Sequence, residues 1–145
     1  MCGRFGLTTG GEQLQLRFGF GWSRTGMTRR PRYNIAPTQD VVAVVQRGDE
    51  RHGGLLRWGL IPSWAKGPSV GSRNINARAE TAGEKPSFRE ALERRRCLVL
   101  ADGFFEWRKQ AGGRKTPMWL HLASGQPFAF AGDRKSTRLN SSHRL

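Results

Sequence analysis

The stretch VVAVV at residues 41–45 decides the fold class of this chain. Four of its five residues are valines, whose branched side chains favour an extended backbone and pack well on the surface of a sheet. Because no polar residue interrupts the run, it predicts a buried strand.

Further apolar segments follow this strand along the chain. The sequence RHGG at residues 51–54 predicts a turn into a second strand at 55–61, and CLVL at 97–100 predicts a third. Segments 104–108 and 117–122 flank Gly112-Gly113, a pattern typical of a hairpin, and residues 127–131 predict one more strand.

Two short helices are expected beside these strands. Thr9-x-x-Glu12 and Ser87-x-x-Glu90 match the capping-box pattern, and apolar residues four apart follow or overlap each of them. With no internal repeat and no linker, the chain is expected to form one domain. The predicted fold class is α+β, mostly β, with a curved or barrel-like sheet and short flanking helices.

The composition of the 145 residues fits a globular protein, with 37 % hydrophobic and 25 % charged residues. No apolar run is long enough to span a membrane, and no signal-peptide pattern opens the chain. Two cysteines are too few for a disulfide scaffold, so a cytoplasmic setting is expected. The formal net charge of +14 favours a polyanionic partner such as nucleic acid.

The last residues have an unusual origin. The sequence DRKSTRLNSSH at 133–143 back-translates, codon after codon, into a common sequencing adapter. We therefore expect residues 133–145 to be an artefact rather than native protein, and the native domain to cover residues 2–132 without its C-terminal strands. Residues 1–132 remain strongly basic when the tail is set aside.

Cys2 is the residue with the most informative chemistry. An initiator methionine is usually removed before a small second residue, and removal would leave an α-amine and a thiol on adjacent carbons. The reference pKa of an α-amine lies at about 7.7–8.0, so a sizeable neutral fraction exists near neutral pH. Such a 1,2-aminothiol condenses with an aldehyde to a thiazolidine ring, and the opened sugar of an abasic DNA site carries an aldehyde.

Four other segments combine polar, aromatic and charged residues. Trp58 falls in a predicted strand and is expected in the core, whereas Trp64 falls in a loop beside cations, as in proteins that stack single-stranded bases. Glu106 stands between aromatic residues, where partial burial would suit it to proton transfer, although a structural ion pair is the commoner role. The segments are residues 33–37, 57–66, 74–81 and 101–107.

These motifs together resemble one family. MCGRF, YNIAP, RWGLIP, NARAET and ADGFFEW, in this order, are similar to the SRAP family (SOS-response-associated peptidase, the abasic-site processing proteins) over residues 2 to 132. Each motif is weak alone, but five in order are specific.

The resemblance implies a function and a set of site residues. Family members form a thiazolidine crosslink between an N-terminal cysteine and abasic sites in single-stranded DNA, and they release their own initiator methionine. By motif match, Cys2 is the nucleophile, Asn76 orients the sugar and Glu106 is the acid or base. The residues expected to contact DNA are Arg4, Asn34, Pro37, Trp64 and Arg78.

The sequence departs from the family at its catalytic histidine. That residue lies in a His-x-Arg-x-Pro motif, which none of His52, His121 and His143 matches. No histidine of this chain is therefore assigned the role, and the histidine's contribution to sugar opening and crosslink reversal has no counterpart here.

Two alternatives stay open at the level of sequence. One is a peptidase with Cys2 as its N-terminal nucleophile, and the other is a single-strand-binding module in which Cys2 is inert. No cofactor and no metal are expected, because the chain has no Cys-x-x-Cys pair and its histidines are scattered. The expected partner is single-stranded DNA with abasic sites, with the protein a monomer that does not bind membranes.

Overall fold

The computed structural model of the chain describes residues 2–23 and 30–135. The strands are β1 (Arg4–Leu7), β2 (Gly21–Trp22), β3 (Arg32–Ile35), β4 (Asp40–Arg47), β5 (Glu50–Arg57), β6 (Arg96–Ala101), β7 (Gly103–Lys109), β8 (Lys115–His121) and β9 (Phe128–Asp133). The helices are α1 (Gly11–Phe18), the 3-10 helix η1 (Pro68–Arg73), α2 (Ala79–Ala82) and α3 (Arg89–Arg94).

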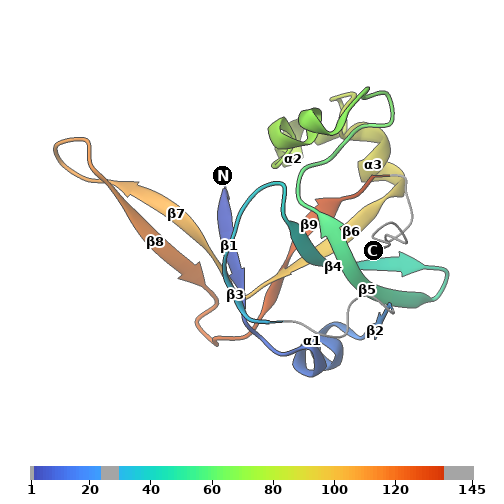
Figure 1. The fold of residues 1–145 in the computed structure, drawn as a ribbon, viewed down its shortest axis with the longest axis horizontal. Coiled ribbons are helices and arrows are strands. Elements are labelled where there is room, and N and C mark those ends of the chain that lie inside the picture. The colour runs from blue at the N-terminus through green and yellow to red at the C-terminus, as the bar shows by residue number, and fades with distance from the viewer. Residues whose placement is uncertain (1, 24–29, 136–145) are drawn as a thin grey trace.

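The strands form two sheets (Figure 1). A four-stranded sheet has the order β3-β1-β7-β8, and a five-stranded sheet has the order β2-β5-β4-β6-β9. Within the described ranges the end strands of each sheet have one neighbour only, so neither sheet closes into a barrel. The prediction of a mostly β fold with short helices is confirmed.

The core lies where the two sheets face each other. The ring of Phe5 on β1 lies 5.1 Å from that of Trp58 and 5.9 Å from that of Phe130 on β9. Residues 41–45 are buried throughout, which confirms the strand that the valine run predicts. Trp58 packs against the core cluster, as expected.

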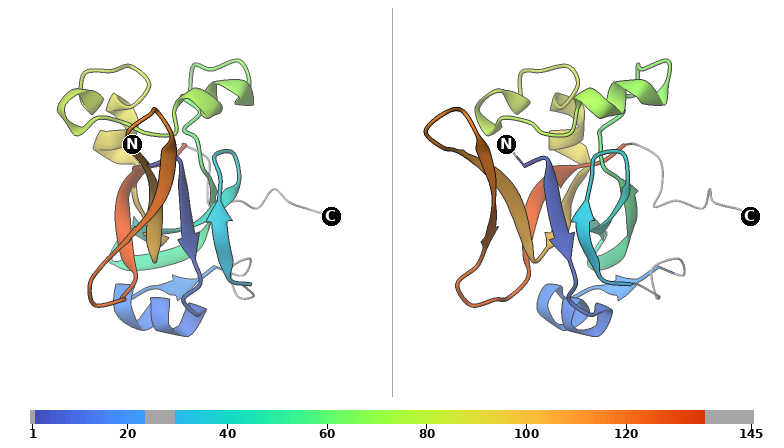
Figure 2. Two further views of the ribbon diagram at one scale, coloured as in Figure 1. Left: turned by 90° about the vertical axis from the view of Figure 1, so that its left-hand side faces the viewer. Right: turned by 60° about the vertical axis from the view of Figure 1, so that its left-hand side comes forward.

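The two ends of the molecule differ (Figure 2). Helix α1 and β2 lie at one end, whereas η1, α2 and α3 lie at the other. The start of β1 lies at the second end, so the helical segment between β5 and β6 stands beside the residues that precede β1.

The hairpin around Gly112-Gly113 is confirmed. Strands β7 and β8 pair antiparallel from Gly103 opposite His121 to Lys109 opposite Lys115. Both turn glycines have positive φ angles, 84° and 81°, which side chains disfavour. The tip of this hairpin projects away from the rest of the fold (Figure 1).

Both predicted capping boxes are wrong, although the helices are present. Helix α1 begins after Gly10, without a side-chain cap, because the Thr9 hydroxyl donates its hydrogen bond to Asp102 instead. Helix α3 begins after Phe88, also without a side-chain cap, so Ser87 does not fill the role that its motif predicted.

The predicted turn at residues 51–54 is also wrong, because these residues lie inside β5 and the turn falls at Gly48-Asp49. Gly53 is required for packing rather than for turning: a Cβ there would lie 2.1 Å from the ring of Phe20. The predicted strand at 55–61 ends at Arg57, and Gly59 then adopts a φ of 121°.

The assignment of residues 133–145 to an adapter artefact stays a prediction. Strand β9 extends to Asp133, opposite Arg96, two residues beyond the predicted strand end. Most of the segment, residues 136–145, lies outside the described residues.

Candidate functional site around Cys2

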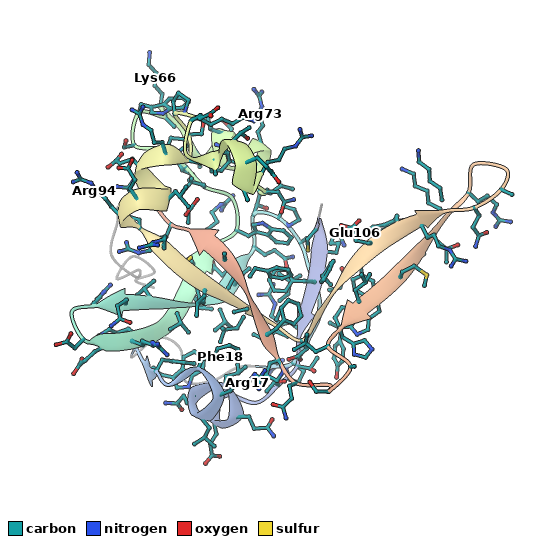
Figure 3. All side chains as sticks on the ribbon, turned by 180° about the vertical axis from the view of Figure 1, so that it is seen from behind. Arg17, Phe18, Lys66, Arg73, Arg94 and Glu106 are labelled. Atoms are coloured by element: carbon teal, nitrogen blue, oxygen red, sulfur yellow. The ribbon has the colours of Figure 1, made fainter. Side chains whose placement is uncertain are left out.

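Strand pairing brings Cys2 to the same end of the sheet as Glu106. Strands β1 and β7 are antiparallel, with Arg4 opposite Phe105 and Phe5 opposite Phe104. The residues before Arg4 therefore run alongside the part of β7 that follows Phe105. Glu106 lies beside the start of β1 in Figure 3, which agrees with this register.

A cavity of about 520 Å³ opens at this end of the fold, and the three residues expected to be catalytic line it together: Cys2, Asn76 and Glu106. The other lining is largely apolar and includes Phe5, Trp58, Phe104 and Phe130. Polar groups that converge in a mostly apolar hollow are the usual composition of a small-molecule or reaction site.

Asn76 contacts Cys2 directly. Its Nδ2 donates a hydrogen bond of 2.7 Å to the backbone carbonyl oxygen of Cys2. The segment that carries it is held in place, because Nδ2 of Asn74 donates to the Leu60 carbonyl and Nε1 of Trp58 donates to the Ile75 carbonyl. The asparagine thus fixes the backbone next to the reactive thiol and amine.

The environment of Cys2 keeps its thiol protonated. Burial raises the pKa of the Cys2 thiol, and the negative charge of Glu106 raises it further. Attack by sulfur at neutral pH therefore requires a group that takes the proton, and a carboxylate that lines the same cavity can do so.

Arg4 and Asn34, two of the residues expected to contact DNA, bind each other. Nη1 of Arg4 donates a 3.0 Å hydrogen bond to Oδ1 of Asn34 across β1 and β3. Both side chains are exposed, so the guanidinium keeps donors for a phosphate next to the cavity. This pairing has no signal in the sequence, where the residues stand far apart.

Pro37, Trp64 and Arg78 do not line the cavity. Pro37 lies in a tight turn in which Thr38 has a φ of 72°. Trp64 is 60 % exposed in the loop after β5, and Arg78 is exposed directly before α2. These residues lie on the surface, and other cations of the helical segment, Lys66, Arg73 and Arg94, also point outward (Figure 3).

Asp102 is a structural residue that the sequence did not single out by itself. Its carboxylate accepts four hydrogen bonds, from the backbone N–H and the hydroxyl of both Thr8 and Thr9, at 2.6–2.9 Å. It thereby joins the end of β1 to the β6–β7 corner. Since β7 carries Glu106 and β1 follows Cys2, this contact holds the two strands of the site in register.

Among the described residues, no group of three or more His, Cys, Asp and Glu side chains is placed to hold a metal ion. Neither His52 nor His121 lines the cavity, and His143 lies outside the described ranges. No helix in the described part of the chain is both long and apolar enough to cross a membrane.

The geometry defines a mostly β protein in which an N-terminal cysteine, an amide and a carboxylate share one cavity. The profile of the family described as SOS response associated peptidase (SRAP) matches residues 1–143. The chain belongs to this family.

Curated relatives and a solved structure agree. The chain is 43 % identical, over 91 % of its length, to the abasic site processing protein YoqW of Bacillus subtilis, and 33 % identical, over 84 %, to the abasic site processing protein HMCES of Gallus gallus. A crystal structure of a protein from Bacteroides thetaiotaomicron has a TM-score of 0.71 at 26 % identity, covering 90 % of this chain and 58 % of that one. The chain spans 59 % of the Bacillus relative and 42 % of the avian one.

Proposed function

We propose that this protein acts in DNA repair by forming a covalent crosslink between Cys2 and abasic sites in single-stranded DNA. The observation that carries the proposal is the cavity shared by Cys2, Asn76 and Glu106. The names of the relatives as abasic site processing proteins support it. The proposed site of action is the cytoplasm, where thiols are kept reduced.

The reaction has two stages. Hydrolysis of the Met1–Cys2 peptide bond, by the protein itself or by an aminopeptidase, consumes one water and frees the α-amine. The amine then adds to the aldehyde carbon of the opened sugar and loses water to give an imine. Finally Sγ adds to the imine carbon while the nitrogen takes a proton, which closes a thiazolidine ring with the net loss of one water.

Each site residue has a defined task in this scheme. Asn76 holds the Cys2 backbone through its 2.7 Å hydrogen bond and so aims the amine and thiol at one carbon. Glu106 accepts the thiol proton as sulfur attacks and can return it to nitrogen. Because the pKa of the thiol is raised, its attack depends on such a base.

The DNA strand is bound by charge and by stacking. Arg4 and Asn34, which lie next to the cavity, hold a phosphate beside the lesion, and Arg78, Trp64 and Pro37 contact the strand farther out. The net charge of +14 makes this binding sensitive to salt. The protein acts as a monomer and without a metal or cofactor.

The experiment is a denaturing gel. The protein with Met1 removed is incubated with single-stranded DNA that carries one abasic site, beside Cys2→Ala and the matched control Cys97→Ala, which removes the other thiol. A heat-stable shifted band is expected for the unaltered protein and for Cys97→Ala, and none for Cys2→Ala. No band from any folded protein would contradict the proposal, and turnover of unrelated peptides would favour a peptidase.

A further inference from the structure

The outer side of the four-stranded sheet carries a second set of aromatic residues, on the face opposite to the core. Side chains alternate along strands, and Phe5 and Phe104 point into the core. Their neighbours Gly6, Gly103 and Phe105 therefore lie on the other side, together with Trp119, which pairs with Phe105. We call these four residues the outer face.

Two glycines of the outer face make room for one indole ring. A Cβ at Gly103 would lie 2.3 Å from Cζ2 of Trp119, and a Cβ at Gly6 would lie 3.0 Å from its Cη2. The indole therefore reaches from β8 across β7 to β1 and occupies the space that two side chains would fill. The ring of Phe105 lies 4.8 Å from it.

The indole is held but not covered. Trp119 remains 41 % exposed, and Trp107, farther along the hairpin, is 46 % exposed. An aromatic ring fixed by its neighbours and open to solvent suits the stacking of a flat partner, because little side-chain entropy is lost on binding.

The charges around the outer face select the partner. Arg4 pairs with Phe105 at one end, and Lys109 pairs with Lys115 at the other. The hairpin also carries Arg108 and Arg114 against the single acid Glu106, which lines the cavity instead. This excess of cations opposes association with a second copy of the hairpin and favours a polyanion with flat groups.

We propose that the outer face binds the single-stranded DNA that flanks the abasic site, with bases stacked on Trp119 and Phe105 and phosphates bound by Arg4, Lys109 and Lys115. The inference rests on the proposed function, and it extends the DNA path from the cavity onto the β7–β8 hairpin. Continuity supports it, because Arg4 lies two residues from Cys2 and directly opposite Phe105.

The test uses undamaged single-stranded DNA, which has no aldehyde, so its result does not depend on crosslinking by Cys2. Oligonucleotides carrying 5-iodouracil are irradiated with the unaltered protein, and tryptic peptides are identified by mass spectrometry. Label on the peptides 97–108 or 116–134, which contain Phe105 and Trp119, is the expected result. Label confined to other peptides, such as 58–66 with Trp64, would overturn the inference.

Affinity measurements with variants give a second readout. Trp119→Ala is expected to weaken binding of an undamaged oligothymidylate about 5- to 100-fold, the range for loss of one stacked base, while Trp119→Phe retains part of the affinity. The matched control is Leu16→Ala, an exposed apolar residue on α1. Equal affinity of Trp119→Ala and Leu16→Ala, or a dimer in which Trp119 is shielded from the photolabel, would contradict the proposal.

Loss of the abasic crosslink would leave these measurements intact. If Cys2 forms no adduct but Trp119 is labelled, the proposed function fails and the outer face stands. If Cys2 forms the adduct and Trp119 is neither labelled nor needed for affinity, the outer face fails and the proposed function stands.

Discussion

The side-chain amide of Asn76 donates a hydrogen bond of 2.7 Å to the carbonyl oxygen of Cys2, joining residues 74 positions apart. The contact leaves the thiol and, once Met1 is removed, the amine of Cys2 free to react. It orients the residue that the proposed chemistry uses twice, first through nitrogen and then through sulfur.

Removal of this contact is expected to slow crosslinking more than it affects folding. Asn76→Ala should reduce the crosslinking rate about tenfold, the value of one hydrogen bond, and Asn76→Asp should reduce it further because a carboxylate repels the Cys2 carbonyl. The measurement is the single-turnover rate of adduct formation with abasic single-stranded DNA.

The control for Asn76 is Gln15→Ala. Gln15 also donates its side-chain amide to a backbone carbonyl, that of Phe20, but at the α1 end of the fold. An equal loss of crosslinking rate in Gln15→Ala and Asn76→Ala would show that the effect is general loosening of the fold.

Glu106→Gln is expected to move two properties of Cys2 in opposite directions. Burial and the charge of Glu106 both raise the pKa of the Cys2 thiol, so neutralising Glu106 lowers this pKa and shifts the pH profile of its alkylation to lower pH. Crosslinking should nevertheless slow about 10- to 100-fold, because the proton acceptor is lost.

Alkylation is followed peptide by peptide, which gives an internal control. Burial raises the pKa of Cys97 to about 12, so Cys97 should remain unmodified in the folded protein in both variants. Faster crosslinking by Glu106→Gln, in step with its more acidic thiol, would rule out a proton-transfer role for Glu106.

Asp102→Asn is expected to destabilise the fold by about 1–3 kcal/mol at neutral pH, because four donors on Thr8 and Thr9 lose their carboxylate. Burial alone would raise the pKa of Asp102, but these hydrogen bonds outweigh it and hold the pKa below its ordinary value. The carboxylate therefore contributes its stability above the unfolded-state pKa of about 4, and the contribution is lost as pH falls through the lower folded-state pKa.

The stability difference should thus be largest at neutral pH and shrink in acid. Denaturant unfolding of both proteins at several pH values measures it. Asp49→Asn, at the exposed β4–β5 turn, is the control and should change stability little. A difference between the unaltered protein and Asp102→Asn that does not depend on pH would contradict the assignment.

Local sequence patterns predicted the parts of the fold that depend on local structure. The valine run at 41–45 and the glycine pair at 112–113 predict a strand and a hairpin, because branched side chains favour extended backbone and the turn needs positive φ. The capping box at Thr9 failed because a residue 93 positions away, Asp102, binds the same hydroxyl. Gly53 looked like a turn residue but makes room for Phe20.

The site shows the same division. Cys2, Asn76 and Glu106 were expected from their motifs, and their convergence on one cavity depends on the pairing of β1 with β7 and on the segment before α2. The Arg4–Asn34 contact and the position of Trp119 over two glycines come from strand neighbours far apart in the chain. Spacing along the sequence carries no signal for such neighbours.

The most direct test of the central claim is the intact mass of the adduct before and after borohydride treatment. The protein with Met1 removed and abasic single-stranded DNA should give a species equal to their sum minus one water, and its mass should not change with borohydride because a thiazolidine has no C=N bond. An adduct that gains two hydrogens would be an imine without participation of the thiol. That result, or an adduct of the same kind from Cys2→Ala, would contradict the proposed mechanism.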